Sequence, residues 1–245
     1  MPRTITKTVY TFRELLALHR EGKVAQKTVQ RVRSWLTEGQ TMDDWWEYIF
    51  ELWKKALDQI GFENAAIAFS GFWSQGDGAS FTASVNVAEL ANFMATDHEA
   101  TDVIPASSDP GGEDFRGWIV EQIGGLNSNH RYRKLALAAN FIDAQVNRIS
   151  HRYSHENTCS FQADLQDTGS VGGRPAYAWA SNMPRLRALF EEWRLHCEAL
   201  RKELCQAIYR GLEQEYEQLT SDVSLIECSE ANDYRFDEWG RAEPG

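Results

Sequence analysis

Hydrophobic residues recur along most of the chain at three- and four-residue intervals, which predicts a largely helical protein. The clearest case is residues 42–60, where the apolar positions form one wide face. Thr41 stands where an N-cap residue belongs, and the acids that follow it favour a helix start. Thr11 and Glu14 have the spacing of a capping box and predict an earlier helix. Further helices are predicted over residues 23–36, 87–95, 115–123, 132–149 and 183–219.

Other segments alternate between apolar and polar residues, as strands do. Strands are predicted over residues 4–10, 65–70 and 80–85, in the second half of 151–165, and around Tyr234 and Phe236. The pair 65–70 and 80–85 flanks a glycine-rich loop and should form an antiparallel hairpin, and the segment from Gly169 to Pro175 should turn the chain. The predicted fold class is α+β, an antiparallel sheet packed against several helices with one long C-terminal helix.

The composition supports one compact domain over residues 1–245, because 42% of the residues are hydrophobic and nine are Trp. Residues 101–113 contain two prolines and small polar residues, which predicts a mobile surface loop. No apolar run is long enough to span a bilayer, and the first residues lack the apolar stretch of a signal peptide. The four cysteines are scattered, which predicts free thiols in a reducing compartment. We therefore expect a cytoplasmic protein without a structural disulfide.

The formal net charge of −11 disfavours a protein that binds nucleic acid by neutralising phosphates. A local basic stretch from Arg13 to Arg33 departs from this balance, and the helices of residues 11–36 have a rough helix-turn-helix layout around Gly22. A DNA-contacting module in this region is therefore kept as an alternative. An acidic protein can also imitate DNA and occupy a DNA-binding partner.

The most specific feature is the loop Gly71-Phe-Trp-Ser-Gln-Gly-Asp-Gly-Ala-Ser80. Asp-Gly is a standard signal of a tight hairpin turn, and the loop matches neither GxGxxG nor a phosphate-binding P-loop. Its exposed polar and aromatic side chains exceed what a turn requires, so a ligand or partner contact is the functional interpretation. The candidate binding residues are Trp73, Ser74, Gln75, Asp77 and Ser80.

His151 and His155 could form a pocket with the loop. On a helix their spacing would place two imidazoles on one face for a metal, but the following segment alternates like a strand. We therefore expect no metal and no cofactor. Ser80 or Cys159 could act as a nucleophile with His155 as base, but neither the GxSxG motif nor a cysteine-protease signature is present. No residue is therefore assigned a catalytic role, and the sequence leans away from an enzyme.

Several landmarks together resemble a family of uncharacterised phage and prophage proteins. They are Val9-Tyr-Thr-Phe-Arg-Glu-Leu15, Asp43-Asp-Trp-Trp-Glu-Tyr-Ile-Phe50, the loop Gly71–Phe81, and Ala231-Asn-Asp-Tyr-Arg-Phe-Asp-Glu-Trp-Gly240. The family tends to be more acidic after the first landmark, where this chain carries Arg and Lys. The family has no established activity, so the resemblance implies a phage or mobile-element origin and no catalytic residues.

The sequence therefore predicts an accessory protein that binds and inhibits a host protein or immune complex, in the manner of anti-CRISPR proteins. One alternative is a protein that sequesters a small ligand or nucleotide, or a hydrolase, with a pocket near Asp77 and His155. The other is the DNA-contacting module of residues 11–36. The expected partner is a host protein or complex, a homodimer is compatible with the sequence, and neither a membrane nor nucleic acid is expected as a partner.

Overall fold

A computed structural model of the chain describes residues 7–42, 44–98, 115–150, 152–166, 168–171, 174–177 and 184–243. The chain divides into two compact units, Tyr48–Gly211 and the pair of segments Met1–Glu47 and Leu212–Gly245. The single compact domain over residues 1–245 stays a prediction beside this division. No helix among the described residues is long and apolar enough to cross a membrane.

The larger unit contains a four-stranded sheet in which every neighbouring pair of strands is antiparallel. Its strands follow the chain order and are β1 (Phe62–Phe69), β2 (Ala79–Val85), β3 (Ile142–Arg148) and β4 (Cys159–Leu165). The predicted hairpin is confirmed by the pairing of β1 with β2, and the predicted strand in the second half of 151–165 is β4. The fold class is α+β, as predicted.

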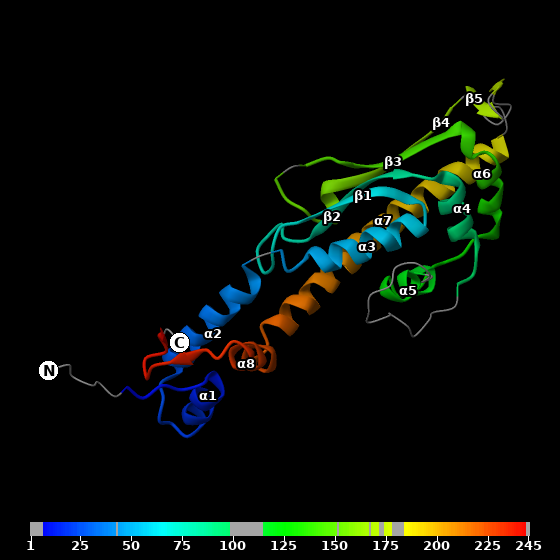
Figure 1. Cartoon of the computed structure of the whole chain (residues 1–245). Coiled ribbons are helices and arrows are strands. Elements are labelled where there is room, and N and C mark those ends of the chain that lie inside the picture. Colours follow the sequence, from blue (N-terminus) through cyan, green and yellow to red (C-terminus); the bar gives the residue numbers. More distant parts are fainter. Residues whose placement is uncertain are drawn as a thin grey trace. The chain divides into compact units, whose positions relative to one another are not determined.

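Helices lie along one side of this sheet (Figure 1). Figure 1 shows α3 and α7 running along the sheet, with α4 and α6 near one end of it. The helices are α3 (Glu47–Gln59), α4 (Val87–Ala95), α5 (Phe115–Gln122), α6 (Arg133–Leu137) and α7 (Pro184–Leu219), and 3₁₀ turns occupy His130–Tyr132, Ala139–Phe141 and Glu156–Thr158. The long C-terminal helix is thus confirmed. The segment predicted to turn at Gly169 to Pro175 forms a separate hairpin of β5 (Thr168–Val171) and β6 (Arg174–Tyr177).

Aromatic side chains fill the core of the larger unit. Trp53 of α3, Phe81 of β2 and Trp193 of α7 are each almost fully buried. The rings of Phe62 and Phe81 meet edge to face at 5.4 Å, and those of Phe161 and Trp193 at 5.6 Å. Such edge-to-face pairs stabilise beyond the area that they bury. The apolar face predicted for residues 42–60 therefore faces the core.

The smaller unit has its own core of apolar side chains. It is built by α1 (Phe12–Arg20), α2 (Gln26–Thr41), α8 (Asp222–Ala231), β7 (Arg235–Phe236) and β8 (Ala242–Glu243). Thr11 and Glu14 form the predicted capping box at the start of α1. The buried residues are Phe12, Leu15, Leu16, Val29, Val32, Leu36, Leu225 and Phe236.

The helix predicted over residues 132–149 is wrong in its second half, which is strand β3. Ile142, Ala144 and Val146 are buried and alternate with polar residues, so the segment has a strand period. The positions 142 and 146 also fit a helical spacing, and the alanine-rich stretch before them favoured helix. Pairing with β2 on one side and β4 on the other decides the conformation.

Other boundaries also differ from prediction. Thr41 caps no helix, because α2 continues through Gly39 to Thr41, whose hydroxyl donates to the Thr37 carbonyl at 2.8 Å. Of the strand predicted over residues 4–10, only Tyr10 forms a bridge, to Phe236, and residues 4–6 lie outside the described residues. The predicted loop 101–113 lies outside them as well. Helix α8 was not predicted, although Ser221 caps it by accepting from the Ser224 N–H.

Candidate functional site

The loop between β1 and β2 is a turn closed by its own aspartate. The Asp77 carboxylate accepts a hydrogen bond from the Ser74 N–H at 2.6 Å, and the Asp77 N–H donates to the Ser74 carbonyl at 3.1 Å. The Ser70 N–H donates to the Gly78 carbonyl at 3.2 Å and joins the two sides of the loop. Asp77 therefore has a structural role, as expected of an aspartate in a turn.

Two glycines allow the loop to pack directly against the segment before β4. A Cβ added to Gly78 would lie 2.6 Å from the His155 Cβ and 2.9 Å from the Ser154 carbonyl oxygen. A Cβ on Gly76 would lie 2.7 Å from the Tyr153 ring. Such close approach of backbone to its neighbours requires glycine. The structure thus brings the backbone of Gly78 next to His155, whereas a pocket that joins Asp77 and Ser80 to His155 stays a prediction.

The exposed part of the loop is short. Trp73 is 75% exposed and has a left-handed backbone with φ of 67°, and Ser74 and Gln75 beside it are also exposed. Asp77 is half-buried. Ser80 is only 2% exposed, so it does not belong to the surface formed by Trp73, Ser74 and Gln75.

An aromatic base supports the exposed tryptophan. The Phe72 ring lies 5.4 Å from the Trp73 ring, 4.9 Å from the Phe69 ring of β1 and 5.6 Å from the Tyr209 ring of α7. The exposed Trp73 residue is therefore supported by packed aromatic side chains beneath it. A left-handed backbone is unusual for a bulky residue and is typical of sites where structure is held for function.

The His155 side chain is engaged in local structure. Its Nδ1 accepts from the Asn157 N–H at 3.2 Å, and its backbone N–H donates to the Thr158 hydroxyl at 3.1 Å. His151 lies outside the described residues. Within the described part of the chain, no group of at least three His, Cys, Asp or Glu side chains is placed to hold a metal ion.

Sequence reasoning missed a buried polar cluster between β4 and α7. Arg201 is completely buried and holds the Glu198 carboxylate through two hydrogen bonds of 2.9 and 2.6 Å. Its guanidinium also donates to the Glu156 carbonyl at 2.6 Å and to the Cys159 sulfur at 3.1 Å. The Cys159 and Cys205 sulfurs are 3.8 Å apart. Burying a guanidinium is costly unless every neighbour compensates it, as these acceptors do. An arginine within an apolar helical stripe is the sequence signal that could have revealed it.

The cluster changes the acidity of its members. The hydrogen bond from the Cys205 thiol and the nearby Arg201 charge lower the pKa of Cys159 to about 6, although burial opposes this. The same pairing raises the pKa of Cys205. Burial alone raises the pKa of Cys197. All four cysteines are free thiols, with Cys159, Cys197 and Cys205 buried and Cys228 half-buried.

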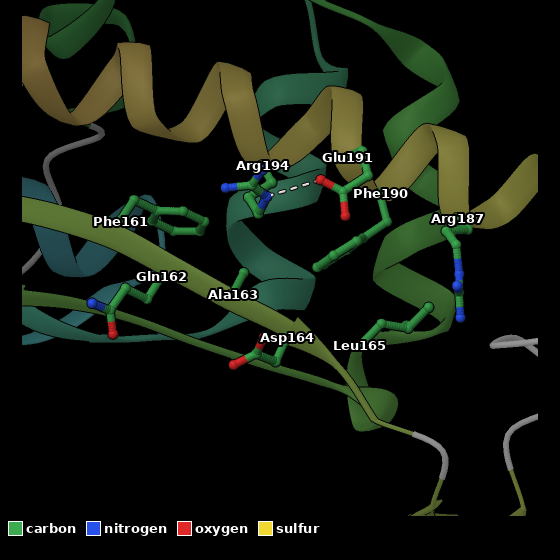
Figure 2. Close-up of a pocket in the computed structure, with 9 residues that line it drawn as sticks. All are labelled: Phe161, Gln162, Ala163, Asp164, Leu165, Arg187, Phe190, Glu191 and Arg194. Carbon is green, nitrogen blue, oxygen red and sulfur yellow. Dashed lines mark hydrogen bonds and ion pairs between the residues drawn. The ribbon is translucent and has the colours of Figure 1, made fainter.

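A groove lies beside this cluster, farther along β4. Its volume is about 570 Å³, and it is lined by residues 161–165 of β4 and by Arg187, Phe190, Glu191 and Arg194 of α7. Figure 2 shows the arginines and Glu191 hanging from the helix above the strand. Arg194 donates to Glu191 at 3.0 Å. This groove could not be predicted from the sequence, because it depends on how far apart the helix and the strand lie.

Residues 45–222 match the family described as domain of unknown function DUF8835, and the chain belongs to that family. The match covers the loop, the buried cluster and the groove, and it excludes α1, α2 and the strands β7 and β8. A comparison with curated proteins and a comparison with solved structures each gave no match.

Proposed function

We propose that the chain is a non-enzymatic binding protein of phage or mobile-element origin, which inhibits a host protein or immune complex in the host cytoplasm. The loop Gly71–Gly78 is its contact surface. The observation that carries the proposal is Trp73, a residue that is 75% exposed on a turn held by Asp77 and by packing on residues 153–155. A tryptophan presented on a pre-formed turn is the kind of anchor that dominates protein interfaces.

The origin and the type of target rest on other support. The resemblance to phage proteins through the loop, the Trp-Trp helix and the C-terminal landmark suggests the origin. The net charge of −11 suits a partner with a cationic face, such as a nuclease-based immune complex.

The observations weigh against a pocket that uses Asp77 and His155. The Asp77 carboxylate is bonded to the loop backbone, and the His155 Nδ1 accepts from the Asn157 N–H. A general base needs a free lone pair within reach of a substrate. The Nδ1 lone pair of His155 is taken by the Asn157 N–H, and one of the two Asp77 carboxylate oxygens is held by the Ser74 N–H. The backbone of Gly78 also packs so closely against His155 that not even an added Cβ fits between them.

The DNA-contacting alternative for residues 11–36 is likewise disfavoured. Arg13 pairs with Glu230 at 2.7 Å, and Arg33 pairs with Asp222 at 2.6 Å. Lys23 pairs with Glu21 at 2.7 Å. Phosphate binding needs cations that are not already neutralised by neighbouring acids, so this stretch is less basic in the fold than in the sequence.

The test is affinity purification from host cells with mass spectrometry, comparing the wild type with Trp73→Ala. Trp239→Ala is the matched control, because Trp239 is also an exposed tryptophan, at 53%. We expect a stoichiometric host partner with the wild type and the control, and its loss with Trp73→Ala. Expression of the wild type should also protect an infecting phage from host defence. Absence of both a partner and protection would overturn the function, whereas equal recovery with Trp73→Ala would overturn only the role of the loop.

A further inference from the structure

Strand β4 is one edge of the four-stranded sheet, and its free backbone groups can be assigned. The Ile149 N–H donates to the Thr158 carbonyl, and the Gln166 N–H donates to the Phe141 carbonyl. In the register of β3 with β4, these contacts show that the even-numbered residues of β4 use their backbone N–H and C=O groups to bond with β3. Phe161, Ala163 and Leu165 therefore point their N–H and C=O groups outward, away from the sheet.

Part of this edge is already covered. The Phe161 N–H donates to the Glu198 carboxylate of α7 at 2.8 Å, and Arg201 holds that carboxylate in place. Proteins commonly protect sheet edges in this way. Among the residues that the structure describes, the N–H groups of Ala163 and Leu165 have no such acceptor from α7.

Helix α7 carries a second Glu–Arg pair beside the part of β4 that it leaves uncovered. Glu191 and Arg194 stand two helical turns before Glu198 and Arg201, with the same spacing between acid and base. Glu198 reaches the strand, but the Glu191 carboxylate is bonded to Arg194. Between this second pair and the strand lies the groove of about 570 Å³ (Figure 2), which is within the size range of ligand sites.

We propose that this groove binds an extended peptide segment of a protein partner, which adds to β4 as a further strand and places acidic side chains against Arg187 and Arg194. Strand addition uses main-chain hydrogen bonds for affinity and side-chain contacts for specificity. Here the backbone N–H and C=O groups of Ala163 and Leu165 supply the main-chain hydrogen bonds. The charged side chains of α7 that line the groove supply the side-chain contacts.

The spacing and the chemistry of the α7 side chains in the groove indicate which peptide sequence would fit. Arg187 and Arg194 are about 10.5 Å apart along the helix axis. Two peptide residues four positions apart on the same face of a strand are about 13 Å apart, within reach of long side chains. Phe190 lies between the arginines on the groove wall. The face toward α7 should therefore read acidic, apolar, acidic at alternate positions.

A lone segment fits the groove better than a second copy of this chain. The edge of a second copy would bring its own α7 on the same face of its sheet, and that helix would compete for the space that α7 already bounds. An isolated strand requires only the usual spacing of about 4.8 Å from β4. This surface is separate from the loop at Trp73, so the inference does not depend on the proposed function.

The probe is the fluorescein-labelled peptide Thr-Glu-Thr-Val-Thr-Glu-Thr with blocked ends, and the readout is fluorescence anisotropy with the full chain. Ala163→Pro removes the outward N–H while leaving the bonds to β3, and edge strands tolerate proline in that position. We expect it to weaken binding about three- to tenfold, the contribution of one main-chain hydrogen bond. Ala163→Ser keeps the N–H and is the matched control. Circular dichroism checks that both variants fold.

Charge and backbone are tested separately. Arg194→Gln should weaken binding, and Glu191→Gln should strengthen it, because it removes the carboxylate that competes for Arg194. Two further peptides carry backbone N-methyl groups on alternate residues. One is methylated on its odd-numbered residues and the other on its even-numbered residues. Strand addition requires that one set abolishes binding and the other leaves it intact, a result that needs no protein variant.

The outcomes are decisive in either direction. Equal effects of the two N-methylated sets, or no anisotropy change up to about 1 mM protein, beyond the weak end of specific binding, would overturn the proposal. Sedimentation of the wild type as a dimer that Ala163→Pro converts to a monomer would assign the edge to a second copy and overturn it as well. Trp73→Ala should bind the probe like the wild type, which separates this result from the fate of the loop.

Discussion

Replacement of Gly78 by alanine tests the packing of the loop against the segment before β4. The new Cβ would lie 2.6 Å from the His155 Cβ, 2.9 Å from the His155 Cα and 2.9 Å from the Ser154 carbonyl oxygen. Two of these three neighbours are backbone atoms, so no side-chain rotation relieves the overlap. Overpacking of this kind typically costs about 1–3 kcal/mol. We expect the upper half of that range, which corresponds to a melting temperature lower by about 4–12 °C in a chain of this size.

The matched control is Gly124→Ala, after α5. Gly124 has a positive φ of 76° and Gly78 one of 157°, but nothing lies within 4 Å of a Cβ added to Gly124. It should cost only the strain of that conformation, about 1–2 kcal/mol. Thermal unfolding and urea titration of both variants give the comparison. If Gly78→Ala loses no more stability than Gly124→Ala, the loop does not pack against His155 and the reasoning is refuted.

Three further predictions follow from the described contacts. Thr11→Ala removes the side-chain acceptor of the capping box with Glu14 and should cost about 1 kcal/mol in a urea titration, with Thr8→Ala as a control that should cost nothing measurable. Trp53→Ala in the core should cost about 3–5 kcal/mol, and near wild-type stability would contradict its burial. Cys159 has a lowered pKa in the fold, so it stabilises the protein fully above the ordinary thiol pKa of about 8.5, and this contribution is lost as the pH falls through about 6. Stability should therefore rise more steeply between pH 6 and 9 in the wild type than in Cys159→Ser, and parallel curves would refute the shift.

The sequence predicted those elements whose signals are local. Helices α1, α4 and α7 have clear periodicity or a capping residue, and the Asp-Gly turn identified the first hairpin. Strand β3 could not be predicted in the same way, because Ile142 and Val146 satisfy both a helical and a strand period. Its conformation is decided by β2 and β4, which are distant in sequence. Gly39 suggested a helix end, but it lies within α2, where nothing crowds it.

The candidate site divides in the same way. The exposure of Trp73 and the role of Asp77 in the turn follow from a loop pattern that the sequence displays. Other features depend on tertiary packing. They are the contact of Gly78 with His155, the burial of Ser80 and the hydrogen bonds from Arg201 to Glu198. A glutamate and an arginine three positions apart on a helix usually form a solvated surface pair. Only the three-dimensional structure distinguishes the pair at 198 and 201, whose arginine is fully buried, from its exposed repeat at 191 and 194.

The distribution of thiols makes the chain suitable for site-specific labelling without engineering. Only Cys228 is partly accessible, whereas the other three cysteines are enclosed in the core of the larger unit. A maleimide dye should therefore attach at a single position in the folded protein and at all four after denaturation. Cys228 lies on α8, distant in sequence from both the tryptophan loop and the β4 groove. Native cysteine chemistry can thus immobilise or tag the protein for interaction measurements while both surfaces stay unmodified.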